Sequence, residues 1–270
     1  MNAKKHVWER LVVYFAAIIF AFPIVATITG SFASAFEISA KASKQIVLIP
    51  RCFSLNQYLQ VFFSSDRYLR SFLFSFFVAL TIASSSSLIA FFSAYVFAKI
   101  QFRWRENIFF LYLLMMLMPY QVTLVPNFLI VRQLGLYNSV WGLILPGIFA
   151  PFSVVLLRQF IRQIDTEICE VFRMDCNSSI RLMYSIIFPC CRPGFCVVFV
   201  LSFSESWNMI EQPLTLISDP LLMPLSILLS QSGWISQNTI YAASVVAMLP
   251  MIVLFLYFND QLIIGLESVK

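Results

Sequence analysis

The chain of 270 residues contains six continuous apolar stretches long enough to cross a lipid bilayer. They run over about residues 11–29, 71–97, 107–131, 140–157, 188–203 and 241–258. A spanning helix needs about 20 mostly apolar residues, because the hydrocarbon core is roughly 30 Å thick. The stretches lack the alternation of apolar and polar residues that marks a membrane strand, so we expect helices.

The composition excludes the common classes of soluble protein. Hydrophobic residues make up 60% of the chain and charged residues only 11%, against roughly 45–50% and 25% in soluble domains. So few polar side chains cannot cover the surface of an ordinary cytosolic enzyme, a disordered chain or a nucleic-acid binder. We therefore predict an all-α integral membrane protein with six transmembrane helices.

The first apolar stretch has two readings. Lys4, Lys5 and Arg10 precede it, and residues 33–35 (Ala-Ser-Ala) resemble the cleavage site of a signal peptide. A cleavable signal has an apolar region of about 7–15 residues, whereas this stretch is nearer 20. We interpret it as an uncleaved first helix.

The cysteines also have two readings, since five of the six lie between residues 169 and 196. A disulfide or metal site is one. However, no C-x-x-C pair occurs and the single histidine, His6, is far away in sequence. We interpret these cysteines as small hydrophobic residues.

The distribution of Lys and Arg predicts the orientation. With the N-terminus inside, the inner segments carry twelve of the 18 basic residues and the outer segments six. This bias places both termini in the cytoplasm. We divide the chain into an N-terminal segment with the first helix (1–30), an outer loop (31–69) and a five-helix core (70–270) with a polar inner loop at 158–193.

The inner loop predicts a short helix over about residues 165–177. Asp165 or Thr166 is a suitable N-cap, and acidic side chains in the first turn favour the positive end of the helix dipole. Glu170 and Arg173 are three residues apart and share a face. Two interpretations remain open at this point: a solvated connector whose charges pair with one another, or a surface helix that docks onto a partner.

This loop resembles the cytoplasmic EAA loop of binding-protein-dependent ABC importer permeases, the MetI-like transmembrane domain. The family pattern reads roughly E-A-A-x-x-D-G, followed after about a dozen residues by L-P-x-x-x-P. The matching positions are Glu170, Val171 and Phe172 for E-A-A, Asp175 for the aspartate, and Pro189 and Pro193 for the prolines. Cys176 replaces the glycine, so a positive φ there would bring strain or a reshaped turn.

Further segments resemble the carbohydrate subgroup of these permeases, such as the shorter permease of the maltose system. They are the end of the second stretch (residues 94–103), the two prolines of the third with the turn 134–139, the segment 207–214 (Trp-Asn followed by Pro-Leu), and the C-terminal part 249–270.

The resemblance implies a permease that forms half of a sugar or oligosaccharide pathway in a prokaryotic inner or plasma membrane. Its implied partners are a homologous permease, two ATP-binding subunits and an extracytoplasmic solute-binding protein. ATP and Mg²⁺ would be bound by the ATPase subunits, so no cofactor is expected in this chain. In agreement, the sequence has no GxxxxGK[ST] phosphate loop.

The resemblance also assigns an ATPase-coupling role to the loop. Glu170 would be the docking carboxylate, with Asp175 as local support and Phe172 or Met174 as the apolar anchor. Pro189 and Pro193 would complete the motif.

Polar residues near membrane depth predict a substrate path. The candidates are Tyr120, Gln121 and Asn127 around the prolines of the third stretch, and Glu205, Trp207 and Asn208 at the end of the fifth. Proline in a spanning helix frees backbone groups, which is tolerated where a cavity or neighbouring helix satisfies them. A carboxylate near hydrocarbon is costly and is a functional candidate. Alternatively, Glu205 lies at the outer interface and is solvated.

Two other functions compete with a sugar importer. One is a permease of the same superfamily for a peptide, an amino acid or phosphate. The other is a membrane-embedded enzyme, which would need paired acids, an activated nucleophile or histidine ligands within the spans. The only histidine is near the N-terminus and the acidic cluster lies in a loop, so this second function is disfavoured.

Overall fold

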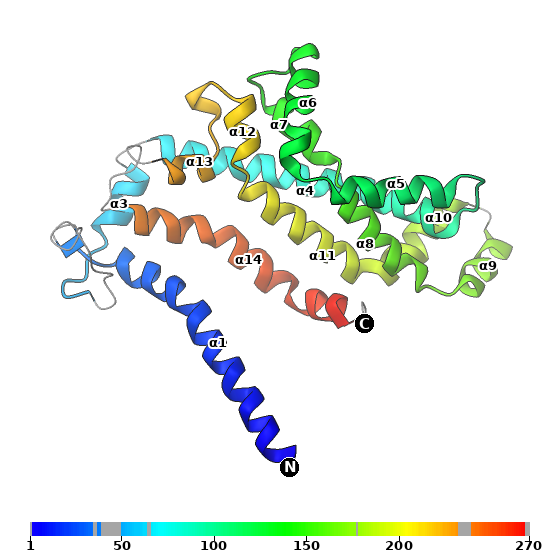
Figure 1. Cartoon of the computed structure of the whole chain (residues 1–270), viewed down its shortest axis with the longest axis horizontal. Coiled ribbons are helices and arrows are strands. Elements are labelled where there is room, and N and C mark those ends of the chain that lie inside the picture. The colour runs from blue at the N-terminus through cyan, green and yellow to red at the C-terminus, as the bar shows by residue number, and fades with distance from the viewer. Residues whose placement is uncertain are drawn as a thin grey trace. The chain divides into compact units, whose positions relative to one another are not determined.

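The computed structural model describes residues 2–34, 37–38, 50–63, 66–176, 178–231 and 239–267. Within these ranges the chain is helical apart from turns and one isolated bridge between Ala33 and Phe53 (Figure 1). The elements are α1 (Asn2–Ser31), α3 (Asn56–Phe63), α4 (Asp66–Lys99), α5 (Arg105–Leu117), α6 (Tyr120–Gln133), α7 (Val140–Ile148), α8 (Pro151–Arg162), α9 (Thr166–Asp175), α10 (Ser179–Leu182), a π-helical turn (Met183–Ile187), α11 (Phe188–Trp207), α12 (Glu211–Leu216), a 3₁₀ turn (Pro220–Leu222), α13 (Leu225–Ser230) and α14 (Ile240–Glu267).

Among the described residues, five helical segments are long and apolar enough to cross a membrane. They are 10–31, 66–99, 140–162, 179–207 and 240–265, and each coincides with a stretch predicted from the sequence. In the first, only 6% of the most apolar window is buried, so its side chains are available to lipid. The all-helical membrane architecture is therefore confirmed.

The third predicted stretch is not one straight helix. It is divided into α5 and α6, which are bent by 102°. Met118 lies at the break with an extended ψ of 125°, because the ring of Pro119 disfavours the helical conformation of the residue before it. The third predicted stretch is therefore a bent pair of helices and not one straight helix. Counted as one broken span, the pair brings the number of candidate spans in the described residues to six.

A proline that restricts the residue before it also interrupts the fourth span, between α7 and α8. Ala150 has a ψ of 88° and precedes Pro151, which then occupies the first turn of α8. Proline is tolerated there because the first N–H groups of a helix have no partner within it.

The chain divides into two compact units, each described here by itself. Unit 1 comprises Met1–Phe72 and Ile227–Pro250. Inside it, the Tyr68 hydroxyl donates to the Ala243 carbonyl at 2.6 Å, and the hydroxyls of Ser31 and Tyr58 lie 2.7 Å apart. These bonds hold the start of α4 to α14 and the end of α1 to α3.

Unit 2 comprises Leu73–Ser226 and Met251–Lys270 and has two apolar clusters, both built on α4. The first cluster joins the C-terminal half of α4 to α5, α8, α9 and α11. The second joins an earlier part of α4 to α6, α7 and α12. Buried members include Phe91, Leu157, Ile161, Leu182 and Ile187 in the first cluster and Val78, Leu143, Ile144 and Leu216 in the second.

A corner between the α6–α7 turn and residues 216–219 closes the second cluster. Asn138 has a φ of +57°, a conformation that asparagine tolerates better than most residues. Its side-chain Oδ1 accepts hydrogen bonds from the N–H groups of Ser218 and Asp219, both at 2.9 Å. The Asn138 N–H donates to the Leu216 carbonyl, also at 2.9 Å.

Replacing Asn138 by glycine should destabilise this corner by about 1 kcal/mol. Glycine accepts the positive φ but removes the acceptor of two hydrogen bonds, each worth roughly 0.5–1.5 kcal/mol when formed. The midpoint of thermal unfolding in detergent measures the effect. Asn138→Asp, which retains an Oδ acceptor, is the matched control, and equal midpoints for the two variants would contradict the assignment.

Candidate functional site

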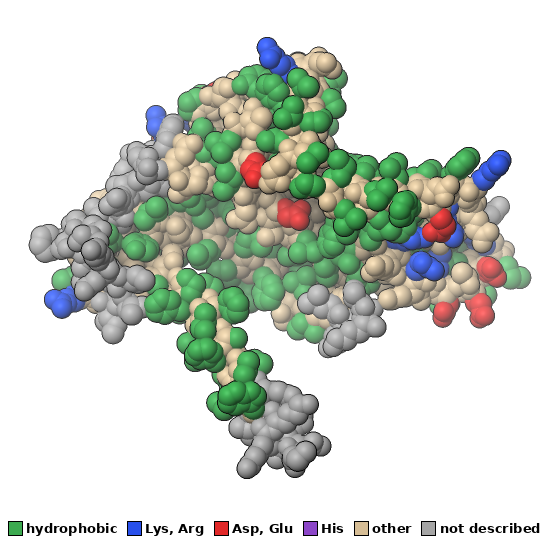
Figure 2. Space-filling view, viewed as in Figure 1, with side chains coloured by type: hydrophobic (Ala, Val, Ile, Leu, Met, Phe, Trp, Pro, Cys, Tyr) green, Lys and Arg blue, Asp and Glu red, His purple; other side chains and the backbone are tan. Residues whose placement is uncertain are grey.

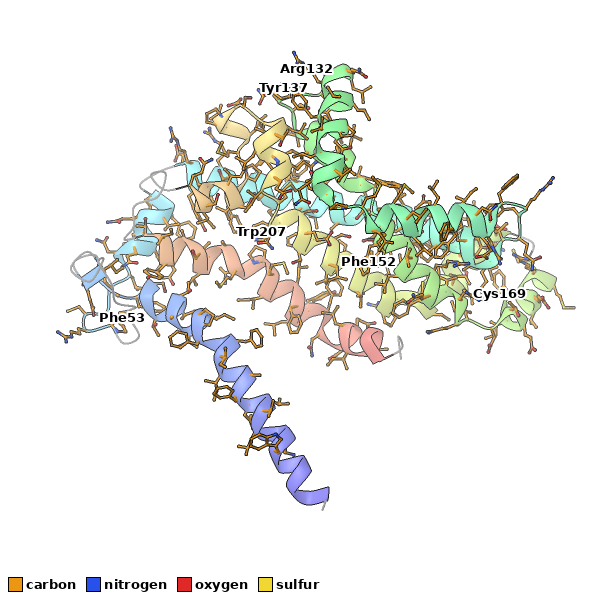
Figure 3. All side chains as sticks on the ribbon, viewed as in Figure 1. Phe53, Arg132, Tyr137, Phe152, Cys169 and Trp207 are labelled. Carbon is orange, nitrogen blue, oxygen red and sulfur yellow. The ribbon has the colours of Figure 1, made fainter. Side chains whose placement is uncertain are left out.

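The helix predicted in the inner loop is α9, with Asp165 at its N-cap position. One side of α9 is held by the first apolar cluster, where Cys169 is buried and Phe172 packs against it. The ammonium of Lys99, the last residue of α4, donates to the carbonyl of Ile164 just before α9. Figure 3 shows Cys169 far from Arg132 and Tyr137, which lie near the α6–α7 turn. The side of α9 that carries Cys169 and Phe172 is thus fastened to the rest of unit 2.

The opposite side of α9 is exposed and mixes apolar with acidic side chains. Met174 is 86% exposed and Val171 62%, and Glu167 and Glu170 are also exposed. We call these four residues the α9 outer face. Met174 and Val171 are apolar side chains exposed on a charged helix, so this face has the composition of a contact surface.

The structure separates the two apolar anchors considered from the sequence. Phe172 faces the chain's own core, whereas Met174 projects outward with Glu170. Asp175 is the last residue of α9, and its side chain lies outside the described part of the structure.

The cysteine at the position of the family's glycine brings no backbone strain. Cys176 has a φ of −148° and a ψ of 112°, an extended conformation open to any residue. Its N–H donates to the Phe172 carbonyl at 2.9 Å, and its Sγ lies 3.4 Å from a guanidinium nitrogen of Arg181. The chain therefore leaves α9 in an extended conformation at Cys176.

The two prolines of the motif lie in α11 and not on α9. Pro189 is in the first turn of α11, and Pro193 lies further inside. The π-helical turn Met183–Ile187 directly precedes them, as expected where proline removes backbone donors from a continuing helix. Their place indicates that they shape the entry into α11.

A cavity of about 790 Å³ lies in unit 2. Of the predicted path residues, Tyr120, Asn127 and Glu205 line it. Gln121 does not, but its amide donates at 3.1 Å to Glu211, which does. The wall is mostly apolar and carries several polar groups, a composition suited to a polar solute with apolar faces. The remaining polar lining residues are Thr123, Ser153, Ser202, Ser206 and Gln212.

The other two predicted path residues lie outside this cavity. Trp207 is buried and stacks on Phe203, with 5.8 Å between ring centroids. The amide of Asn208 donates back to the Ser204 carbonyl at 2.9 Å. Their positions indicate that they complete the end of α11.

No metal or disulfide site is found in the described residues. No group of three or more His, Cys, Asp or Glu side chains there could hold a metal ion, and all six cysteines are unpaired.

Residues 86–263 match the family described as the inner membrane component of binding-protein-dependent transport systems. The chain belongs to this family. It is therefore a multi-pass membrane protein and a transport component. The matched part of this permease includes the C-terminal part of α4 from residue 86, the pair α5–α6, α9, all the cavity-lining residues except Ile82, and most of α14.

Curated relatives are similar over most of their length. The permease is 26% identical over 256 residues to the arabinooligosaccharides transport system permease protein AraQ of Halalkalibacterium halodurans, covering 93% of this chain and 91% of the relative. It is 31% identical over 231 residues to the sulfoquinovosyl glycerol transport system permease protein SmoH of Agrobacterium fabrum, covering 83% and 80%.

A solved structure has the same fold. It is described as a bacterial ABC transporter involved in the import of the acidic polysaccharide alginate. The TM-score is 0.81 at 18% sequence identity, and the match covers 96% of both chains. An ABC permease fold is thus shown.

Two functional features of the permease were missed in the sequence. Glu211 and Gln212 were not among the predicted path residues, yet they form the start of α12 and line the cavity. Their position beside Trp207-Asn208 and before Pro213, inside the motif of the carbohydrate subgroup, was the available signal. The second feature is the ion pair between Arg158 and Glu106, which are 52 residues apart.

Proposed function

We propose that this permease forms half of the membrane pathway of an ABC importer for a sugar or oligosaccharide. It would pair with a homologous permease and work with two ATP-binding subunits and an extracytoplasmic solute-binding protein. ATP and Mg²⁺ would be bound by the ATP-binding subunits. In this proposal the permease itself is not an enzyme.

The observation that carries the proposal is the α9 outer face. Helix α9 presents exposed Glu170 beside exposed Met174 and Val171, while its other side is fixed to unit 2. Such a helix can enter a groove of another subunit without detaching from its own chain. A central charge contact with an apolar anchor is typical of the residues that dominate protein interfaces.

The charge distribution supports a cytoplasmic position for α9 and for both termini. Figure 2 shows Lys, Arg, Asp and Glu side chains gathered at the end of unit 2 where Figure 1 labels α9 and α10. Basic residues concentrate on the cytoplasmic side of membrane proteins. ATP-binding subunits would meet the permease on that side.

The cavity supports a polar, uncharged or weakly charged solute. Sugar hydroxyls can bond to Asn127, Ser202 and Gln212, and the ring faces can lie on Tyr120 or Phe152, all of which line it. The named relatives, including AraQ and a polygalacturonan/rhamnogalacturonan permease of Bacillus subtilis, also point to saccharides.

Reconstitution tests this function. The complete transporter in proteoliposomes should take up arabinotriose or maltotriose when ATP and the binding protein are supplied. Uptake of a peptide, an amino acid or phosphate in place of both saccharides would overturn the substrate class. Purification of this chain as an active homodimer would overturn the proposed assembly.

A further inference from the structure

The ends of α4, α5 and α8 meet at the buried guanidinium of Arg158. Arg158 of α8 is buried, with its side chain 8% exposed. Its Nη2 donates to both carboxylate oxygens of Glu106 at 3.1 Å, and its Nε donates to the Phe97 carbonyl at 3.2 Å. Its Cζ lies 3.6 Å from the ring centroid of Phe109. The side chain thus touches α4 through Phe97 and α5 through Glu106 and Phe109.

These contacts use the particular shape of arginine. A planar guanidinium can donate in several directions at once while one face lies on an aromatic ring. The Phe97 carbonyl belongs to the last turn of α4, where the helix dipole favours a positive charge. A buried charge with several partners resists displacement, because moving away from any one leaves it unsatisfied.

The same three helices carry the attachment of α9. Lys99 at the end of α4 holds the Ile164 carbonyl, and Phe172 packs on the first apolar cluster, to which Phe97 and Phe109 belong. A movement of α9 therefore acts on the ends of α4, α5 and α8. These ends move together only if the contacts among them make them one rigid piece.

We propose that Arg158 is a positioning residue for energy coupling. By fixing the end of α8 to the ends of α4 and α5, it makes these three helix ends, to which α9 is attached, one rigid piece. This piece transmits the movement of the ATP-binding subunits to the broken span α5–α6. This inference rests on the proposed function. It concerns residues that belong neither to the α9 outer face nor to the cavity lining.

The test measures the ratio of sugar-stimulated to basal ATP hydrolysis in the assembled transporter, with the saccharide that the wild type transports. Arg158→Lys retains the charge but loses the forked geometry, and Glu106→Gln weakens the same contact from the other side. Each should lower the ratio at least fivefold. The double variant should fall no further than the worse single variant, because both remove one interaction.

Arg105→Gln is the matched control. Arg105 also pairs with Glu106, at 2.8 Å, but it lies on α5 itself and links no second helix. Its ratio should stay within about twofold of the wild type. If the Arg158 and Glu106 variants lower both rates in proportion and leave the ratio unchanged, the role is only structural and the proposal is overturned. If Arg158→Lys fails to assemble, Glu106→Gln alone decides.

These outcomes differ from a failure of the proposed function. A wild-type complex without any sugar-stimulated hydrolysis would overturn the importer itself. A normal wild type with an unchanged ratio in both variants would overturn only the role of Arg158.

Discussion

Glu170→Lys should lower transport and sugar-stimulated ATP hydrolysis at least tenfold. Glu170 is exposed beside Met174, at the centre of the face proposed to enter a groove of the ATP-binding subunit. Reversing one charge of a desolvated interface pair costs about 3 kcal/mol, which corresponds to roughly a hundredfold in affinity. Uptake and hydrolysis in the reconstituted complex measure the effect.

Two variants separate a specific contact from a general effect of charge. Glu170→Gln retains the size of the side chain and should give an intermediate loss. Arg173→Glu reverses an exposed charge of α9 that does not belong to the α9 outer face, and it should cost less than threefold. The amount of each variant in the membrane should equal that of the wild type, because the side chain makes no contribution to the core. Normal sugar-stimulated hydrolysis in the Glu170→Lys complex would contradict the docking role.

Local chemistry was sufficient to predict the helices. Apolar length alone located all the candidate spans, and N-cap preference with charge spacing located α9 within two residues at each end. Apolar length, N-cap preference and charge spacing all depend on residues that are close in sequence. The direction in which Phe172 and Met174 point was open, since it depends on which side of α9 meets the first apolar cluster.

The broken span shows a limit of reading proline from sequence. Pro119 and Pro126 both remove a backbone donor, yet only Pro119 separates two helices, and Pro126 lies within α6. Proline can begin a helix or be absorbed within one. Which outcome occurs depends on the packing of α6 against α12 and on the second apolar cluster.

The candidate site was only partly predictable, because packing between helices that are distant in sequence brings some of its residues together. Tyr120, Asn127 and Glu205 were identified because polar groups in apolar stretches are unusual. Glu211 reaches the cavity because α12 packs against α6 and α7, far away in sequence. Likewise, Arg158 and Glu106 are 52 residues apart in sequence, and only the fold pairs them.

Gly194→Ala should destabilise the permease by about 2 kcal/mol, the largest stability effect expected here. A Cβ at Gly194 of α11 would lie 2.5 Å from two ring atoms of Phe160 on α8. Phe160 belongs to the first apolar cluster and is buried, so its ring has little room to move. Overpacking costs about 3 kcal/mol, and the better helix propensity of alanine returns roughly 1 kcal/mol.

Gly147→Ala is the matched control for that close approach, and the thermal midpoint in detergent compares the two variants. A Cβ at Gly147 of α7 would meet Cδ1 of Ile82 at 2.9 Å and its Cγ2 and Cγ1 at 3.2 and 3.3 Å, a milder approach than 2.5 Å onto an aromatic ring. The midpoint should fall further for Gly194→Ala than for Gly147→Ala. Adding Phe160→Leu to Gly194→Ala should recover part of the loss, since a smaller side chain frees the space. Equal midpoints for the two glycine variants would mean that α8 and α11 separate freely, and that the close contact of these helices does not stabilise unit 2.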